Sequence, residues 1–267
     1  MILFPNAKIN LGLSIISKRQ DDYHELESIM LPIPLFDILE ITKSKKFEFI
    51  QTGIKVDGDL NANLCVRAFE IMRAKFDISA VRIHLRKQIP MGAGLGGGSA
   101  DATFVIKGLN ELFHLDLSDA QMQELSSELG SDCAFFVRNC PQLAKGRGEI
   151  LKDFELDLTG VYLKIIHPGI HISTKEAFSE VYKSGANNHL LDAISQPKHS
   201  WKDSIYNDFE KHLFVNHPDL LEIKTQCYSE GAFYASMSGS GSTMFGLYDS
   251  EPELSFEKFS LERIFKL

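Results

Sequence analysis

The sequence predicts an α+β protein. Along its 267 residues, stretches in which apolar residues recur at every second position, typical of strands, are mixed with stretches in which they recur every three or four, typical of helices. The two kinds of stretch do not follow the regular strand–helix–strand rhythm of a doubly wound parallel sheet, which favours an α+β arrangement. The chain is long enough for one large domain or two small ones.

Local patterns place the elements of the first half. Apolar and polar residues alternate over residues 9–15, which predicts a half-buried strand with Lys8 and Asn10 on the face opposite the core. Asn63 is a good N-cap for a helix that runs to residue 76. A further helix follows the glycine-rich segment, because apolar residues from position 102 to 113 form one helical stripe. Additional strands are expected at residues 36–41, 46–50 and 81–89.

Capping signals mark the helices that follow. Ser118 and Gln121 have the spacing of a capping box, in which each residue bonds the other's backbone N–H. Gly130 ends the helix that starts there. Ser131 is a candidate cap for a short new helix that begins with Asp132.

Beyond about residue 152 the pattern restarts, which predicts domains 1–152 and 153–267. Ser173 and Glu176 form a second capping box, opening a helix through residue 182. The remaining expectations are a strand at 161–166, a long helix from Pro218 to Gly231, a strand–turn–strand unit over 233–248, and a polar surface excursion over 184–204.

Composition restricts the class of protein. The formal net charge of −8 argues against a general nucleic-acid binder, because nucleic-acid phosphates are held mainly by Lys and Arg. The four cysteines include no C-x-x-C pair and the histidines no metal pattern, so we expect reduced thiols, no structural metal and a cytoplasmic location. Pro5 and Lys8 interrupt the apolar start of the chain, and the uncharged segment 231–248 is rich in Gly and Ser. Neither a signal peptide nor a membrane helix is therefore expected.

The segment "PMGAGLGGGSADAT", residues 90–103, holds five glycines directly after a predicted strand and before a predicted helix. In that position, successive backbone N–H groups and the helix dipole together form an anion site, and glycine lets the backbone wrap closely around a phosphate chain. The alternative is a flexible turn without a ligand. The context favours a phosphate loop.

Three common phosphate sites do not fit this loop. Gly92, Gly94 and Gly97 satisfy G-x-G-x-x-G formally, but no acidic residue ends a following strand as a dinucleotide fold requires. The segment lacks the G-K-[ST] of a Walker loop. The chain also lacks the V-A-I-K, H-R-D and D-F-G elements of protein kinases.

The loop instead resembles the phosphate loop of the GHMP small-molecule kinases. "NAKINLGL" near the start of the chain resembles the first motif of that family, and "SMSGSGSTMF" near the end resembles its C-terminal glycine motif. Similar segments extend over nearly the whole chain: "DDYHELESIM", "NLCVRAFEIM", "GSDCAFFV", "KGRGEIL", "HPGIHISTKEAF" and "YNDFE". Within the family, these segments are most similar to the members of the non-mevalonate isoprenoid route, whose alcohol substrate carries a cytidine diphosphate. The resemblance implies two α+β domains with an active site in the cleft between them, and an enzyme that uses ATP and Mg²⁺.

The resemblance also implies two catalytic residues. Asp132 would be the base that takes the proton of the substrate hydroxyl, and a place in the first turn of a helix would keep its carboxylate ionised. Lys8 would contact this aspartate and the reacting hydroxyl, lowering the pKa of the hydroxyl and offsetting charge on the transferred group. The alternatives are an ordinary acid at a helix start and a solvated lysine at a strand end.

The substrate residues follow from the same resemblance. Tyr23 and His24 would hold a cytosine base, the first by stacking and the second by hydrogen bonding, and Phe178 would cover the opposite side of the base. Each also has an ordinary structural interpretation, in a loop or in the core. The full set of substrate positions is Asn10, Tyr23, His24, Thr174, Phe178, Gly239 and Gly241; for the last two the alternative is a simple hairpin turn.

The nucleotide would be held by the loop and by two residues near the adenine end, Asn63 and Lys87. Ser99 would contact phosphate or Mg²⁺, or serve only as an N-cap. Ala93 and Ala100 depart from the family pattern, which has glycine at the first position and often serine at the second. The ATP-binding set is Asn63, Lys87, Pro90, Met91, Gly92, Ala93, Gly94, Leu95, Gly96, Gly97, Gly98, Ser99 and Ala100.

Overall fold

The computed structural model describes residues 1–267 except 22, 56–58, 60–61, 180–189 and 255–258. The chain divides into two compact units, the first made of Met1–Lys8, Pro32–Met91 and Gly96–Cys140, the second of Ile9–Leu31, Gly92–Leu95 and Pro141–Leu267. The units interleave along the sequence because two long strands each contribute residues to both. The domain limits 1–152 and 153–267 treat each domain as one stretch, and they remain a prediction.

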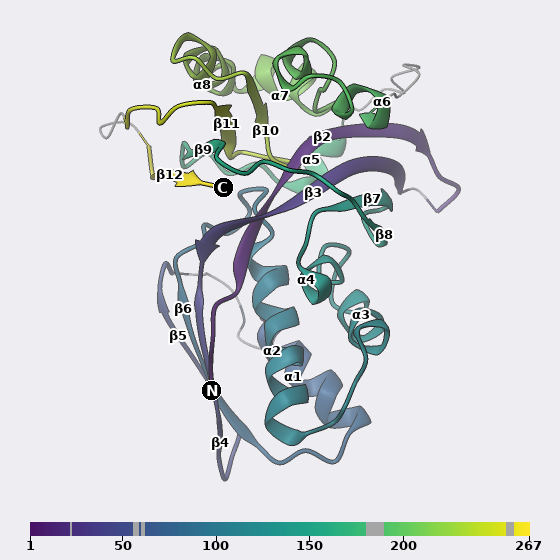
Figure 1. The fold of residues 1–267 in the computed structure, drawn as a ribbon. Helices are drawn as coiled ribbons and strands as arrows, with labels where there is room; N and C mark the ends of the chain where they lie inside the picture. Colours follow the sequence, from purple (N-terminus) through teal and green to yellow (C-terminus); the bar gives the residue numbers. More distant parts are fainter. Residues whose placement is uncertain (22, 56–58, 60–61, 180–189, 255–258) are drawn as a thin grey trace. The chain divides into compact units, whose positions relative to one another are not determined.

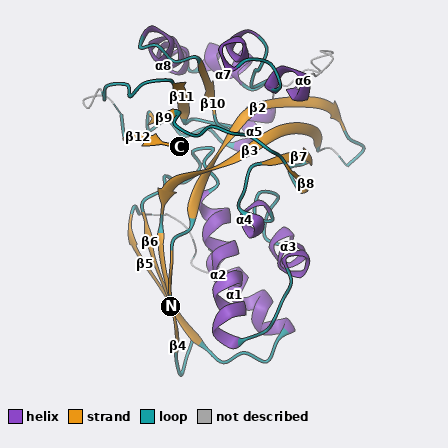
Figure 2. Ribbon diagram, in the orientation of Figure 1, coloured by secondary structure: helices purple, strands orange, loops and turns teal. Residues whose placement is uncertain are grey.

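The first unit contains a four-stranded sheet and a group of helices (Figures 1 and 2). Its elements are β1 (Ile2–Leu3), β4 (Ile38–Lys43), β5 (Glu48–Gly53), β6 (Val81–Lys87), α1 (Leu64–Lys75), α2 (Gly97–Phe113), α3 (Asp119–Ser127) and α4 (Phe135–Arg138). The strand order is β1-β4-β6-β5, and β4 is antiparallel to β1 and β6, whereas β5 is parallel to β6. Helix α2 packs against α1, α3, α4 and β4, so its buried apolar stripe lies in the core of this unit.

The second unit contains two four-stranded sheets, of orders β2-β3-β7-β8 and β10-β11-β9-β12, although the first residues of β2 and the last of β3 are grouped with the first unit. Its strands are β2 (Asn6–Lys18), β3 (His24–Phe36), β7 (Gln142–Gly146), β8 (Ile150–Asp153), β9 (Tyr162–His167), β10 (Tyr234–Met237), β11 (Met244–Tyr248) and β12 (Leu261–Lys266). Its helices are α5 (Thr174–Ser179), α6 (Leu190–Ile194), the 3₁₀ helix η2 (Lys198–Asp203), α7 (Glu210–Asn216) and α8 (Pro218–Ser229). The pair β10–β11 is an antiparallel hairpin, and α8 packs on both of its strands.

Several predicted elements and caps are confirmed. The Asn63 side chain accepts a hydrogen bond from the Cys65 N–H at 2.9 Å and caps α1. The capping box of Ser118 and Gln121 is present at the start of α3. Pro218 is the first residue of α8, and the strand–turn–strand unit expected over 233–248 is the β10–β11 hairpin. The α+β class is likewise confirmed.

Other expectations are corrected. Strand β2 is not half-buried: every side chain from Asn6 to Ile15 is buried, so the polar face with Lys8 and Asn10 is covered as well. Only one half of the capping box of Ser173 and Glu176 is present: Glu176 N–H donates to the Ser173 hydroxyl. The Glu176 carboxylate pairs with His217 at 2.8 Å instead of accepting from the Ser173 N–H.

The short helix predicted from Asp132 begins at Phe135. Residues 131–134 form a turn closed by i→i+3 hydrogen bonds, such as Cys133 N–H to the Gly130 carbonyl at 3.1 Å. Asp132 is therefore held by a turn and not by a helix start.

The polar segment 184–204 is only partly described, since residues 184–189 lie outside the described residues, as do residues 180–182 at the end of the predicted earlier helix. The described part forms α6 and η2, and Trp201 is buried there. Among the residues that the structure places, no helix is both long and apolar enough to cross a bilayer.

Candidate active site

Local geometry explains why glycine occupies most of its positions in the loop between β6 and α2. Gly92, Gly94 and Gly96 have φ angles of 62°, 77° and 69°, in the left-handed region that side chains with a Cβ disfavour. Gly97 is the first residue of α2, and a Cβ there would lie 2.8 Å from Ile89 Cγ2. Backbone conformation and close packing therefore account for four of the five glycines.

The N-terminus of α2 has the properties of an anion site. Gly96 is its N-cap and provides no side-chain cap, and the hydrogen bond from Ala100 N–H to the Gly96 carbonyl at 2.9 Å closes the first turn. In an α-helix, the N–H groups that precede this bond have no acceptor within the helix, and the dipole of a 17-residue helix adds positive potential beside them. The N–H groups of residues 97–99 therefore fit a phosphate group. Ser99 stands inside the helix, so its alternative role as the N-cap is excluded.

Lys8 and Asp132 form an ion pair beside this helix terminus. The distance from Lys8 Nζ to Asp132 Oδ2 is 3.2 Å, and the lysine side chain is 4% exposed whereas the aspartate is 32% exposed. A Cβ on Gly96 would lie 3.1 Å from Lys8 Cγ and 3.2 Å from Cε, so the lysine side chain packs directly against the N-cap of α2. An acid–base pair thus adjoins the anion site within the first unit.

The turn that carries Asp132 is fixed to α2. The buried Thr103 hydroxyl donates to the Cys133 carbonyl at 2.7 Å. The Cys133 side chain also hydrogen-bonds Ser99, and burial raises the pKa of this thiol to about 11, so it remains protonated. Asp132 is therefore positioned by the helix that begins at the anion site.

Lys87 lies in a buried cluster of charges at the end of β6. Its ammonium pairs with Asp37 and with Asp101 Oδ2, the second at 2.7 Å, and all three side chains are at most 2% exposed. Burial raises the pKa of Asp101 to about 8, an effect that the positive charge of Lys87 opposes. Burial alone would lower the pKa of Lys87, but the two carboxylates more than offset it and the pKa is raised. The ammonium is thus engaged with Asp37 and Asp101, so a nucleotide contact by Lys87 remains a prediction.

In the second unit, loop residues 92–95 are bonded to the turn between β10 and β11. The Ser238 hydroxyl donates to the Gly94 carbonyl at 2.8 Å, and Thr243 N–H donates to the Ala93 carbonyl at 3.2 Å. A Cβ on Gly94 would lie 1.9 Å from the Ser238 carbonyl oxygen. Two glycine-containing motifs far apart in the sequence therefore form one structure.

Two of the predicted base-binding residues are in contact. The rings of His24 and Phe178 are stacked, with centroids 5.0 Å apart and an interplanar angle of 25°. Burial, aided by the charge of Lys18, lowers the pKa of His24, so its ring is neutral near pH 7. Tyr23 is 56% exposed, and the guanidinium of Arg147 lies 4.9 Å from the centroid of its ring.

The remaining predicted substrate residues have mixed environments. The Asn10 amide donates to Ser28 Oγ at 2.9 Å, and its backbone N–H donates to Ser238 Oγ at 3.3 Å. Thr174 is an exposed residue at the start of α5. Gly239 and Gly241 have φ angles of 55° and 86° within the β10–β11 turn, so the turn itself requires glycine at both positions.

The comparisons with known proteins agree on the family. The GHMP kinases N terminal domain matches residues 63–139, and the GHMP kinases C terminal domain matches residues 189–265. A 4-diphosphocytidyl-2-C-methyl-D-erythritol kinase of Bacteroides fragilis (strain YCH46) is 46% identical over 269 residues, covering 99% of this chain and 97% of that protein. The chain belongs to the GHMP kinase family. The resemblance seen in its three motifs is thus confirmed, and so are the fold class and the assignment as a kinase.

Further relatives of this GHMP kinase are consistent with that result. An enzyme of the same name from Cytophaga hutchinsonii is 45% identical over 261 residues, 97% of each chain. A crystal structure of 4-(cytidine 5'-diphospho)-2C-methyl-D-erythritol kinase superposes with a TM-score of 0.80 at 31% identity, covering 92% of this chain and 90% of that one. The Methanococcus jannaschii mevalonate kinase, at 17% identity and a TM-score of 0.75 over 99% of this chain and 96% of its own, shows the same fold.

Several residues of this GHMP kinase were missed by reasoning from the sequence. Ser238 and Asn207 lie within motifs that carry the family resemblance, but neither motif signals which side chain holds the loop. Thr103 and Asp101 follow the glycines along α2, where only the three-dimensional structure shows that they point to Cys133 and Lys87. Among the described residues, no group of three or more His, Cys, Asp or Glu side chains has an arrangement that could hold a metal ion.

Proposed function

We propose that this GHMP kinase transfers the γ-phosphate of ATP to the 2-hydroxyl of 4-diphosphocytidyl-2-C-methyl-D-erythritol, in the cytoplasm and in the non-mevalonate route to isoprenoids. The names and near-complete coverage of the relatives support the substrate, and the family implies ATP. The observation that carries the chemistry is the Lys8–Asp132 ion pair beside the N-cap of α2.

In this proposal Asp132 is the general base. The substrate hydroxyl oxygen forms a bond to the γ-phosphorus as the bond between that phosphorus and the β,γ-bridging oxygen breaks, and ADP leaves. The hydroxyl proton passes to the Asp132 carboxylate, which pairs with Lys8. The Lys8 ammonium stabilises the negative charge that develops on the attacking oxygen and the transferred group.

The loop and α2 would position the phosphates. The N–H groups of residues 97–99 face the N-terminal end of α2 and suit phosphate oxygens, and Gly94 and Gly96 keep side chains away from the backbone there. Mg²⁺ bound with ATP would neutralise phosphate charge, with Ser99 as a candidate hydroxyl ligand. Little covalent chemistry is required of the protein, so catalysis rests on positioning and electrostatics.

The cytosine base would be recognised in the second unit. The exposed Tyr23 ring offers a stacking surface, and a neutral His24 ring both donates and accepts hydrogen bonds, as the polar edge of cytosine requires. Phe178 holds the His24 ring by stacking. Mevalonate, homoserine and galactose have no base. Rings that bind a base would therefore favour the cytidine-bearing substrate over the substrates of other GHMP kinases.

The test is ATP turnover with 4-diphosphocytidyl-2-C-methyl-D-erythritol, beside mevalonate, homoserine, galactose and unconjugated methylerythritol. Turnover confined to the cytidine-bearing alcohol is expected. Activity only on another alcohol would refute the substrate and leave a kinase of the mevalonate or homoserine type. Inactivity on all of them would favour a non-catalytic nucleotide-binding protein, which has no use for the Lys8–Asp132 pair.

A further inference from the structure

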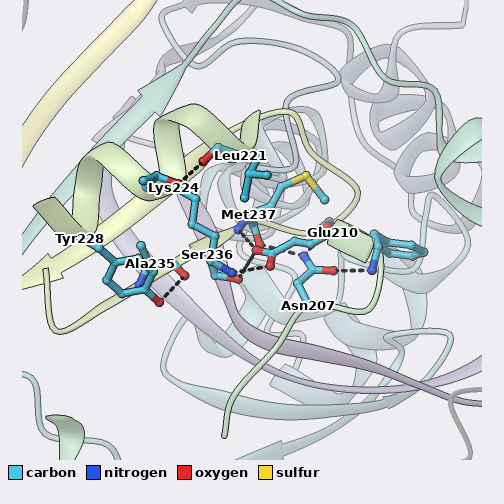
Figure 3. Close-up of polar contacts among 11 residues, drawn as sticks. Asn207, Glu210, Leu221, Lys224, Tyr228, Ala235, Ser236 and Met237 are labelled. Carbon is cyan, nitrogen blue, oxygen red and sulfur yellow. Dashed lines mark hydrogen bonds and ion pairs between the residues drawn. The ribbon is translucent and has the colours of Figure 1, made fainter. Parts of the chain in front are cut away.

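A buried polar network lies beneath the β10–β11 turn, and neither the proposed chemistry nor the predicted site makes use of it. Asn207 is 2% exposed and Glu210 is 6% exposed, although both are strongly polar. Figure 3 shows the two side chains directed toward the Ser236–Met237 end of β10. A buried polar side chain is costly unless it is hydrogen-bonded, so the partners of these two residues indicate what they hold in place.

Asn207 bonds the backbone on both sides of Ser238. Its Nδ2 donates to the Met237 carbonyl and to the Gly239 carbonyl, each at 2.8 Å, while its Oδ1 accepts from Phe209 N–H at 3.0 Å. All three hydrogen bonds are made by one amide group. The conformation of the turn at Ser238 is therefore tied to the position of Asn207.

Asn207 is itself fixed to strand β2. It forms a parallel bridge with Leu13, whose N–H donates to the Tyr206 carbonyl at 2.9 Å and whose carbonyl accepts from Asp208 N–H at 2.8 Å. The Asp208 carboxylate accepts from Ile15 N–H at 2.7 Å. The amide thus extends from a segment bonded to a buried strand.

Glu210 reinforces the same end of β10. Its Oε1 accepts from Met237 N–H at 2.8 Å and from the Ser236 hydroxyl at 2.9 Å, and its Oε2 pairs with Lys224 of α8 at 2.5 Å (Figure 3). Asn207 bonds the carbonyl of Met237 and Glu210 bonds its N–H. The last residue before Ser238 is therefore held through both of its backbone polar groups.

Ser238 connects this network to the phosphate loop. Its hydroxyl donates to the Gly94 carbonyl at 2.8 Å, and its own carbonyl is the atom that a Cβ on Gly94 would meet at 1.9 Å. At such close approach, a shift of the turn must move the loop. The path of contacts runs from Asn207 through the carbonyls of Met237 and Gly239 to Ser238 and then to Gly94, entirely within the second unit.

We propose that Asn207 is a positioning residue for ATP binding: it sets the conformation of the β10–β11 turn, and Ser238 transmits that conformation to the backbone of the phosphate loop. The proposal rests on the loop's proposed role in binding ATP and not on the identity of the alcohol. The side-chain hydrogen bonds of Asn207 described above go to Met237, Gly239 and Phe209, so its proposed effect on the loop is indirect.

The test measures the Kd of ATP for the whole chain by calorimetry, without any alcohol substrate. Asn207→Ala should raise the Kd of ATP about tenfold, within the roughly 2- to 30-fold range of energetic coupling between sites that do not touch. Tyr228→Phe is the matched control: it removes the hydroxyl that bonds the Ala235 backbone at 3.2 Å, in the same hairpin but away from Ser238. The control should lower the thermal midpoint and leave the Kd unchanged.

A double-mutant cycle tests the path. Ser238→Ala removes the hydroxyl that reaches Gly94, so adding Asn207→Ala to it should change the Kd by a smaller factor than Asn207→Ala changes it in the wild-type protein. Two results would overturn the proposal: full additivity of the two effects on the Kd of ATP, or an unchanged Kd in Asn207→Ala together with a lower thermal midpoint. In either case the Asn207 amide would have only a structural role. If Asn207→Ala does not fold, Asn207→Ser replaces it in the cycle, with the same outcomes.

These outcomes are separate from those of the proposed reaction. ATP affinity can respond as expected even if the diphosphocytidyl alcohol is not phosphorylated, in which case only the substrate is wrong. Wild-type turnover without any effect of Asn207→Ala on the Kd refutes the positioning role alone. If the wild-type protein does not bind ATP, both proposals are wrong.

Discussion

Replacement of Gly94 by alanine should be among the most disruptive single-methyl changes in the phosphate loop. The φ of Gly94 is 77°, and the new Cβ would lie 1.9 Å from the Ser238 carbonyl oxygen. A left-handed conformation costs an L-residue roughly 1–2 kcal/mol. Relief of the contact requires the loop and the turn to separate, which breaks the Ser238–Gly94 and Thr243–Ala93 hydrogen bonds at about 1 kcal/mol each.

The sum is a loss of about 3–4 kcal/mol in the free energy of unfolding. For a chain of this size, that corresponds to a fall of roughly 6–16 °C in the thermal midpoint. The assay is thermal unfolding of the ligand-free protein, followed by circular dichroism. The matched control is Gly98→Ala, because that residue lies in α2 and the nearest atom to its Cβ would be the flexible end of Met91, at 3.3 Å. A midpoint for Gly94→Ala within about 2 °C of the control would refute the reasoning.

Three other predictions concern the catalytic base, the base-binding rings and the buried charges. Asp132→Asn should lower kcat by roughly 10²–10⁴-fold and leave the Kd of ATP nearly unchanged, and near-normal turnover would remove Asp132 from its role. Tyr23→Ala should raise the KM for the diphosphocytidyl alcohol by roughly 5- to 150-fold, the equivalent of about 1–3 kcal/mol of stacking on the base, and Phe178→Ala, which removes the ring stacked on His24, should raise the same KM; the KM for ATP is the internal control. The pKa of Asp101 is about 8 in the folded protein, against a reference value of 3.8. Between these pH values the folded protein retains a proton that the unfolded chain releases. The free energy of unfolding therefore falls as the pH rises from 3.8 to about 8. Asp101→Asn cannot titrate, so urea unfolding should show its stability relative to wild type rising over that interval; a constant difference would mean that Asp101 is ionised throughout.

The elements that were predicted correctly are those specified by nearby residues. The cap at Asn63 and the capping box at Ser118 depend on side chains within three positions of the backbone groups they bond. Strand β3 was not predicted, since Pro32 and Pro34 lie within it and proline is unfavourable inside a strand. The full burial of β2 was also missed, because what covers its polar face comes from distant parts of the chain.

In the candidate site, too, features specified by nearby residues were predicted, and contacts between distant residues were not predicted from local patterns. A glycine loop between a strand and a helix was predicted from the sequence, and the helix does begin there, whereas phosphate binding by this loop stays a prediction. The Lys8–Asp132 pair was expected only from the family resemblance, because 124 positions separate the two residues and no local pattern joins them. The engagement of Lys87 with Asp37 and Asp101 gave no sequence signal at all, since charged residues are ordinarily expected at the surface.

The hydrogen bond between Gly94 and Ser238 joins residues 144 positions apart, and this spacing affects how the protein is made. At about 5–20 residues per second, a ribosome needs roughly 7–30 s to add the second residue after the first. During that time the glycine segment of a nascent chain lacks the turn that shapes it. Under the proposed function, ATP therefore has no complete loop to bind until translation has passed the C-terminal hairpin, so we expect the nucleotide to stabilise finished chains and not growing ones.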